Sequence, residues 1–221
     1  MWEGIQRETV FADLILRKGF TIIIMKIIAA TSNPGKVREI KKIFSLPTLE
    51  ILSMKEAGID IEVEENGTSF EENALIKARA IARLCGCAVV SDDSGLCVDA
   101  LGGAPGIYSA RYAGDDATDG ERIEKLLSAL AGEKNRDAKF VSVVAFITPD
   151  GKEFSAEGEV LGRITEEIKG NGGFGYDPVF YSYELEKTFG EASADEKNSI
   201  SHRARALHGL YKTLKENNIL N

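Results

Sequence analysis

Two adjacent carboxylates, Asp92 and Asp93, are the residues of this chain best placed to do chemistry. They follow an apolar run at 87–90 that is typical of a short buried strand, and a glycine-rich segment at 94–106 comes after them. We therefore expect the strand to end at the two aspartates, at the sheet edge where α/β proteins gather functional groups. Because neighbouring carboxylates repel each other, a positive group should lie between or near them, and a divalent cation is the natural candidate.

A second polar segment consists of Thr31, Ser32, Asn33, Pro34, Gly35 and Lys36. It follows a predicted strand at 26–30, and its asparagine and proline predict the N-cap and first position of a helix. The unpaired amides of a first helical turn, the helix dipole, the lysine charge and the two hydroxyls would together suit a phosphate. The first glycine of a Walker A loop is missing, and an ordinary capped helix after a strand could have the same residues.

A glycine-rich turn at 171–178 could approach a flat ligand closely. It contains two aromatic residues and an acid within the run Phe174, Gly175, Tyr176 and Asp177. Glycines leave room for a ligand, and an aromatic ring can stack on a base. A tight loop with its aromatic residues packed inward is the alternative.

The C-terminal region predicts an amphipathic helix. Its apolar face consists of Ile200, Ala204, Leu207, Tyr211 and Leu214. This pattern places Lys197, His202 and Arg203 off the buried face, where they could meet an anionic ligand or belong to a solvated helical surface.

The remaining pattern alternates strands and helices, which predicts an α/β fold. Thr68 or Ser69, each followed three residues later by glutamate, begins a helix that stops at Gly86. Thr118 with Glu121 begins another helix, and the runs 140–148 and 153–161 predict a hairpin.

Length and composition indicate one enzyme-sized unit. The 221 residues are 43% hydrophobic and carry a formal charge of −8, which disfavours broad nucleic-acid binding but permits a small polyanion. The three cysteines form no zinc pattern and indicate reduced thiols in a cytosolic protein. The apolar run at 19–30 superficially resembles a signal peptide, but Lys26 interrupts it and no run is long enough to span a membrane. We expect residues 1–24 to be a leader of uncertain role, with Met25 as an alternative start, and residues 25–221 to form one domain.

Six segments, taken in order, resemble the inosine triphosphate pyrophosphatase family. They are 31–36 (TSNPGK), 70–74 (FEENA), 92–95 (DDSG), 101–111 (LGGAPGIYSAR), 174–178 (FGYDP) and 201–203 (SHR), and the resemblance runs from about Met25 to Leu214. It implies a two-lobed α/β fold with an elongated mixed central sheet flanked by helices and a substrate cleft between the lobes. It also implies a homodimer that requires Mg²⁺ and hydrolyses ITP, dITP and XTP to monophosphate and pyrophosphate. The cysteines, the acidic charge and the short apolar runs separately lead us to expect a cytoplasmic protein that binds neither nucleic acid nor membrane.

The resemblance also implies roles for particular residues. Thr31 to Lys36 would hold the triphosphate, Asp93 would be the catalytic carboxylate, and Ser94 would contact the substrate. An acid within 62–65, with Glu64 preferred, would bind the metal together with Asp93. The base and sugar would be surrounded by Phe174, Gly175, Tyr176, Asp177, Lys197, His202 and Arg203.

The chemistry of the reaction is consistent with these assignments. A water oriented or deprotonated by Asp93 would attack the α-phosphorus while pyrophosphate leaves toward Lys36. Donors from backbone amides or from His202 and Arg203 would accept a 6-oxo purine and reject adenine. A hydrolase for other nucleotides, or one that releases orthophosphate, is the first alternative; a non-catalytic nucleotide-binding module is the second, and nucleic-acid binding the third.

Overall fold

The structure is a computed structural model that describes residues 12–17 and 20–220. The strands are β1 Ala12–Arg17, β2 Phe20–Ala29, β3 Leu49–Ser53, β4 Ala88–Val98, β5 Asp137–Ile147, β6 Glu153–Ile164, β7 Phe180–Ser182 and β8 Lys187–Thr188. The helices are α1 Pro34–Ile43, α2 Phe70–Cys85, α3 Asp119–Ala129, α4 Ala194–Ile200 and α5 His202–Glu216, with short 3-10 turns η1 Asp99–Leu101, η2 Gly106–Arg111 and η3 Asp177–Val179.

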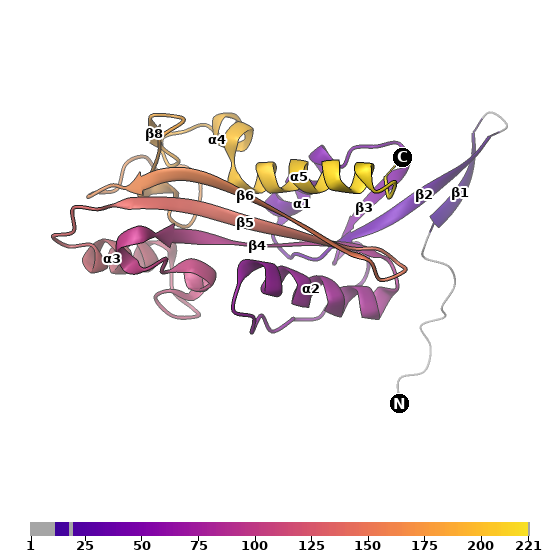
Figure 1. Cartoon of the computed structure of the whole chain (residues 1–221), viewed down its shortest axis with the longest axis horizontal. Helices are drawn as coiled ribbons and strands as arrows, with labels where there is room; N and C mark the ends of the chain where they lie inside the picture. The colour runs from indigo at the N-terminus through magenta and orange to yellow at the C-terminus, as the bar shows by residue number, and fades with distance from the viewer. Residues whose placement is uncertain (1–11, 18–19, 221) are drawn as a thin grey trace.

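These strands form one mixed sheet with the order β1-β2-β4-β5-β6-β7-β8, and β3 pairs with β2. Strand β2 runs parallel to β3 and β4, whereas β4 to β8 are successively antiparallel. The long strands β4, β5 and β6 run along the length of the molecule (Figure 1). The α/β class, with an elongated mixed sheet flanked by helices, is as expected from the sequence.

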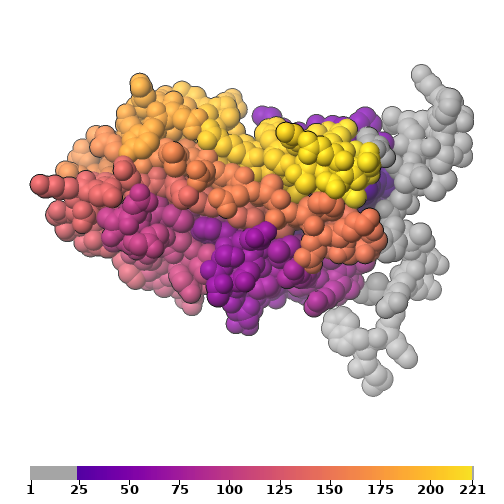
Figure 2. Space-filling view, in the orientation of Figure 1, coloured from indigo at the N-terminus to yellow at the C-terminus, as the bar shows by residue number. Residues whose placement is uncertain are grey.

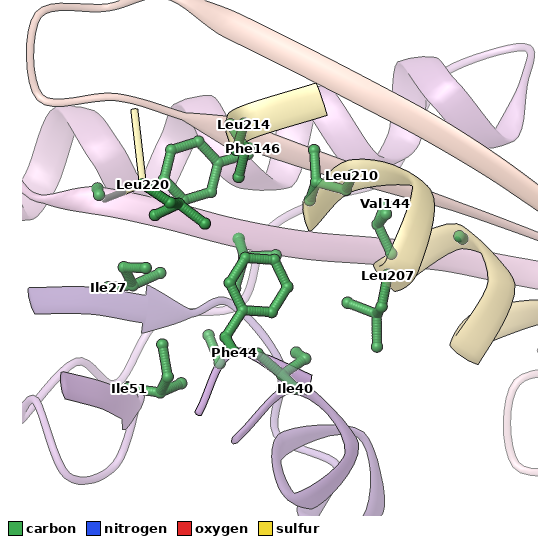
Figure 3. Packing of buried hydrophobic residues seen from close by; sticks show 14 of the residues in the cluster. Ile27, Ile40, Phe44, Ile51, Val144, Phe146, Leu207, Leu210, Leu214 and Leu220 are labelled. Carbon is green, nitrogen blue, oxygen red and sulfur yellow. The ribbon is translucent and has the colours of Figure 1, made fainter. Parts of the chain in front are cut away.

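Helices cover both faces of the sheet. Helix α5 lies along one face of β5 and β6, and α2 lies on the opposite face (Figure 1). The space-filling view shows α5 as a continuous ridge along that side of the molecule (Figure 2). Between α1, α5 and the sheet, Phe44 and Phe146 pack with aliphatic residues such as Leu207 and Leu210 (Figure 3). A separate core at the other end of the sheet buries Leu126 of α3 against β4, β5 and β6.

Most predicted elements are present with longer bounds. Asn33 caps α1, Ser69 caps α2, and Thr118 forms a full capping box with Glu121. Strand β2 begins at Phe20 rather than near Lys26, because its first half pairs with β1. The C-terminal helix is divided into α4 and α5 at Ser201, which has an extended conformation and caps α5, so Ile200 belongs to α4.

The predicted leader, residues 1–24, lies partly outside the described residues, and its boundary remains a prediction. Within the described part of the chain, no helix has the length and apolar character needed to cross a membrane.

Candidate active site

Asp92 and Asp93 lie in the middle of β4, and the expectation that the strand ends at them is wrong. The parallel pairing of β4 with β2 stops at Val90, but its antiparallel pairing with β5 continues to Val98. The two aspartates therefore occupy the segment of β4 that has lost one neighbouring strand while the other still holds it. This arrangement opens the sheet beside the carboxylates and keeps their backbone rigid.

The carboxylate of Asp92 is buried and paired with two cations. Its Oδ2 lies 2.8 Å from Lys36 Nζ and 3.1 Å from Arg203 Nε, and only 1% of its side chain is exposed. Burial alone would raise the pKa of Asp92, but Lys36 and Arg203 hold it well below the ordinary value. Two side chains therefore supply positive charge beside Asp92 Oδ2, while its Oδ1 is buried with no hydrogen-bond partner among the described residues.

Asp93 points to the other face of the sheet, where α2 packs. Its Oδ2 accepts a hydrogen bond from Asn73 Nδ2 at 3.1 Å, and its Oδ1 accepts the Ser94 amide at 2.9 Å. Burial raises the pKa of Asp93, and the Glu65 carboxylate adds to the rise, although the Asn73 bond opposes it. A carboxylate with a raised pKa accepts a proton more readily than an exposed aspartate does.

Lys77 of α2 connects the two sides of this acidic region. Its Nζ lies 2.9 Å from Glu65 Oε1 and donates to the Asp92 carbonyl at 3.0 Å. Asn73 and Lys77 are four residues apart on α2, so they lie on the same face of the helix. The sequence interpretation gave no role to Asn73 or Lys77 and preferred Glu64 to Glu65, and the four-residue spacing within the 70–85 helix was the pattern that could have indicated Asn73 and Lys77.

A cavity of about 500 Å³ brings the predicted segments together. Of the residues predicted to bind substrate, it is lined by Thr31, Ser32, Asn33, Lys36, Ser94, Phe174, Gly175, Tyr176, Asp177, Lys197, His202 and Arg203. Pro34, Gly35 and Asp93 are not part of its lining. The charges of two lining residues, Glu65 and Lys77, nevertheless act on the pKa of Asp93. Glu64 is exposed and does not line the cavity, whereas Glu62 and Glu65 do.

The turn before α1 differs from the expected cluster of free amides. Asn33 Oδ1 accepts the amides of Gly35 and Lys36 at 2.8 and 3.3 Å, and the Asn33 amide itself donates to Thr31 Oγ1. These amides are therefore already used by the cap. The turn offers an anion the hydroxyls of Thr31 and Ser32 and the Lys36 ammonium, which also pairs with Asp92.

His202 and Arg203 are buried, which corrects the expectation that they lie off the buried face. Only 8% and 5% of them is exposed. The first turn of α5 lies directly on Gly158 of β6, where an added Cβ would come within 2.3 Å of the His202 carbonyl oxygen. The Arg203 guanidinium is occupied by protein groups: besides Asp92, it contacts Glu39 at 3.1 Å and Ser94 at 3.4 Å.

The His202 ring stacks on Phe140 at 5.0 Å, and its Nδ1 has no hydrogen-bond partner among the described residues. Burial and the nearby Arg203 charge lower its pKa well below the ordinary value, so the imidazole is neutral at pH 7.

The glycine-rich turn presents an aromatic ring to the cavity. Asp177 Oδ2 accepts the Phe174 amide at 2.9 Å and also pairs with Lys197. Lys197 Nζ lies 4.4 Å from the centre of the Phe174 ring, which is 57% exposed. Burial raises the pKa of Asp177 although Lys197 opposes the rise. The turn therefore combines a charged pair with an accessible flat surface.

Glu65 and Asp93 are the acids best placed to hold a metal. Among the described residues, no cluster of three or more His, Cys, Asp or Glu side chains could hold one. Two carboxylates are sufficient for Mg²⁺, which commonly takes one or two protein carboxylates and completes its coordination with phosphate oxygens and water. The donor set fits such an ion better than it fits zinc or a softer metal.

The fold and the cavity define an α/β protein with a cleft that is lined by cationic and acidic side chains at one end and by aromatic side chains at the other. Residues 27–213 match the model of the Ham1 family. A relative from Clostridium perfringens, named dITP/XTP pyrophosphatase, is 50% identical over 198 residues, covering 86% of this chain and 97% of the relative. One from Bacillus subtilis, with the same name, is 47% identical over 196 residues, covering 88% and 99%. The chain belongs to the Ham1 family.

Solved structures agree with this assignment. The Ham1 protein of Staphylococcus aureus matches with a TM-score of 0.81 and 43% identity, covering 87% of this chain and 99% of that one. A HAM1 protein from Coxiella burnetii matches with a TM-score of 0.82 and 38% identity, covering 87% and 100%. The family resemblance inferred from the six segments is confirmed.

Proposed function

We propose that this protein hydrolyses the non-standard purine nucleoside triphosphates dITP, XTP and ITP to the monophosphate and pyrophosphate. Such an activity removes these nucleotides before they are incorporated into DNA or RNA. Relatives that are 50% and 47% identical to the chain carry the name dITP/XTP pyrophosphatase. The observation that carries the proposal is the single cavity that unites Lys36, Glu65 and Phe174, three residues far apart in the sequence.

The triphosphate binds at the cationic end of the cavity. Lys36 neutralises its charge, and the hydroxyls of Thr31 and Ser32 donate to its oxygens. Lys77, held between Glu65 and β4, supplies a second cation next to the catalytic acid. Catalysis of phosphoryl transfer depends mainly on such positioning and charge neutralisation.

Asp93 is the general base in this mechanism. Its raised pKa favours acceptance of a proton from the water that attacks the α-phosphorus, and pyrophosphate leaves toward Lys36. Asn73 and the Ser94 amide hold the carboxylate in one orientation.

We assign the metal site to Glu65 and Asp93, with Mg²⁺ as the ion. When bound, the ion would neutralise charge on the phosphate oxygens. Glu65 replaces the preferred sequence candidate Glu64, because Glu65 lines the cavity and its charge acts on Asp93, whereas Glu64 is exposed and does not line the cavity.

The base binds at the aromatic end. The Phe174 ring stacks on the purine, and Tyr176, Asp177 and Lys197 form the adjoining wall. A protein donor that bonds to the 6-oxo group of the purine has no acceptor when adenine is bound. Each unpaired donor should lower the preference for ATP relative to ITP by roughly tenfold or more. Neutral His202 is able to donate from one ring nitrogen. Arg203 holds Asp92 and Ser94 in place rather than acting as a free donor.

The protein works as a cytoplasmic homodimer and does not act on nucleic acid. Cys85, Cys87 and Cys97, all among the described residues, form no disulfide, as is usual in a reducing compartment. Light scattering during size-exclusion chromatography measures the mass directly, and a monomer at micromolar concentration would contradict the dimer. Hydrolysis assays with single- and double-stranded DNA test the second statement.

The decisive experiment measures pyrophosphate and orthophosphate released from ITP, dITP, XTP, GTP, ATP and a pyrimidine triphosphate, with and without Mg²⁺. We expect pyrophosphate from the first three alone, and only with the metal. Orthophosphate as product, or a preference for the pyrimidine, would identify a different hydrolase. Tight binding without turnover would identify a binding module.

A further inference from the structure

Asp119, the first residue of α3, holds the tip of the turn that carries Phe174. Its Oδ2 accepts the Gly175 amide at 2.7 Å, and its Oδ1 pairs with Arg122. Gly175 has a φ of 59°, a left-handed conformation that glycine adopts without strain. In this conformation its N–H donates to Asp119. Residues 56 positions apart in the sequence are thus joined directly.

Arg122 extends this connection to the backbone of the cavity wall. Its Nη1 donates to the carbonyl oxygens of Ala110 and Ala117, both at 2.7 Å. The Tyr176 hydroxyl donates to the neighbouring Ser109 carbonyl at 2.9 Å. The turn is therefore attached to the η2 wall at two points, once through Tyr176 and once through the Asp119–Arg122 pair.

The two amides at the tip of the turn are each held by a carboxylate. Asp177, within the turn, accepts the Phe174 amide, and Asp119, outside it, accepts the Gly175 amide. The Phe174 ring is more than half exposed, so apart from its contact with Lys197 packing contributes little to its placement. The position of the ring depends on these backbone anchors, and only the one at Asp119 is supplied by another element of the fold.

We propose that Asp119, braced by Arg122, is a positioning residue that fixes the Phe174 turn for recognition of the base. This inference rests on the proposed function, which places the purine against Phe174. Asp119 acts on the affinity for the base and not on the reacting phosphate. Charge-assisted hydrogen bonds to backbone amides are about twice as strong as neutral ones, so one such anchor is sufficient to hold a short turn.

The test compares three variants by steady-state kinetics with dITP and by thermal unfolding. In Asp119→Ala the Gly175 amide loses its acceptor, and we expect KM to rise about tenfold with kcat changed less than about threefold. Asp119→Asn retains one oxygen acceptor for the Gly175 amide but loses the charge that pairs with Arg122, so its KM should lie between those of the Ala variant and the unmodified protein. Asp116→Ala removes an exposed acid just before the same helix and serves as the matched control.

Hydrogen exchange of the peptide that spans 172–177 provides a measurement independent of turnover. Asp119→Ala should accelerate exchange at the tip, and Asp116→Ala should not. A KM for Asp119→Ala within twofold of the control, or an Asn variant no better than the Ala variant, would overturn the proposal. Unchanged exchange would overturn it as well. If the unmodified protein released no pyrophosphate from any nucleotide, the proposed function would fail, and the exchange rates would still decide whether Asp119 holds the turn.

Discussion

Asp92 and Asp93 are consecutive residues of β4, yet their carboxylates belong to separate networks on opposite faces of the sheet. Asp92 faces α1 and α5 and is paired with Lys36 and Arg203, while Asp93 faces α2 and bonds to Asn73. Side chains alternate along a strand, so adjacency in the sequence separates the two acids. The same alternation explains their different electrostatics, since the pKa of Asp92 is lowered and that of Asp93 is raised.

Replacement of the proposed base tests the role of Asp93. In Asp93→Asn we expect kcat to fall by roughly 10²–10⁴-fold, because a positioned general base is lost. Unfolding by urea should stay within about 1 kcal/mol of the unmodified protein, because removal of a partly buried charge offsets the loss of one of the two hydrogen bonds that Asp93 accepts from Asn73 and from the Ser94 amide. Equilibrium binding of a non-hydrolysable nucleotide should be largely retained. Near-normal turnover would show that another group accepts the proton.

Asp92→Asn should lower the stability of the protein and raise KM, whereas Asp93→Asn should lower kcat. The change at Asp92 leaves Lys36 and Arg203 next to each other without their shared carboxylate, and breaking a buried ion pair in this way costs about 3 kcal/mol or more. We expect a lower free energy of unfolding and a raised KM, because Lys36 is no longer held at the phosphate end of the cavity. Asp93→Asn is the matched control, since it makes the same chemical change one residue away. Equal stability of the two variants would contradict the ion-pair role.

The free energy of unfolding should decrease at low pH because Asp92 becomes protonated. Its folded pKa lies below the ordinary 3.8, so the ion pairs contribute fully above that value and are lost as the pH falls through the folded pKa. Urea unfolding at a series of pH values should show the difference between the unmodified protein and Asp92→Asn narrowing below about pH 4. A difference that stays constant down to pH 3 and below would mean that the pairs contribute little.

The sequence predicted the local elements well because their causes are local. Caps such as Ser69 and the Thr118–Glu121 box, the left-handed stop at Gly86 and the hairpin between β5 and β6 depend on residues within a few positions of each other. The extent of β4 depends instead on β5, whose paired residues lie forty or more positions away in the sequence. Glycine and polar residues at 94–95 would favour a turn, but pairing with β5 overrides that preference.

The sequence predicted many of the residues that line the cavity, but not the ion pairs and hydrogen bonds that they form. The sequence motifs predicted Lys36, Ser94 and Phe174 as binding residues, and all three line one cavity. Helical periodicity, by contrast, predicted Arg203 to lie off the buried face. Periodicity treats charged residues as exposed and has no means of anticipating a buried partner such as Asp92. Glu65 and Glu64 are likewise equivalent in sequence, and only the path of the chain decides which one faces the cavity.

Asn73→Asp should shift the acid limb of the pH–rate profile. The substitution removes the bond that opposes the raised pKa of Asp93 and adds a like charge beside it, so that pKa rises further. Because the deprotonated acid is the active form, kcat/KM should begin to fall at a higher pH than in the unmodified protein. Asn218→Asp, an identical change at an exposed site near the C-terminus, should leave the limb in place. A limb unaffected by Asn73→Asp would mean that it reports a group other than Asp93.

Gly158→Ala tests whether the close backbone contact between α5 and β6 keeps Arg203 in place at the site. An added Cβ would come within 2.3 Å of the His202 carbonyl oxygen and 2.5 Å of the Ala206 amide, and both are backbone atoms that cannot rotate away. We expect the first turn of α5 to be displaced, with a loss of about 2 kcal/mol in the free energy of unfolding and a raised KM as Arg203 moves from Asp92. In Gly209→Ala, within the same helix, the added Cβ would lie 3.4 Å from the Ala156 Cβ, and stability should be equal or higher by up to about 1 kcal/mol. If both variants unfold at the same urea concentration as the unmodified protein, the contact at Gly158 does not hold the helix in place.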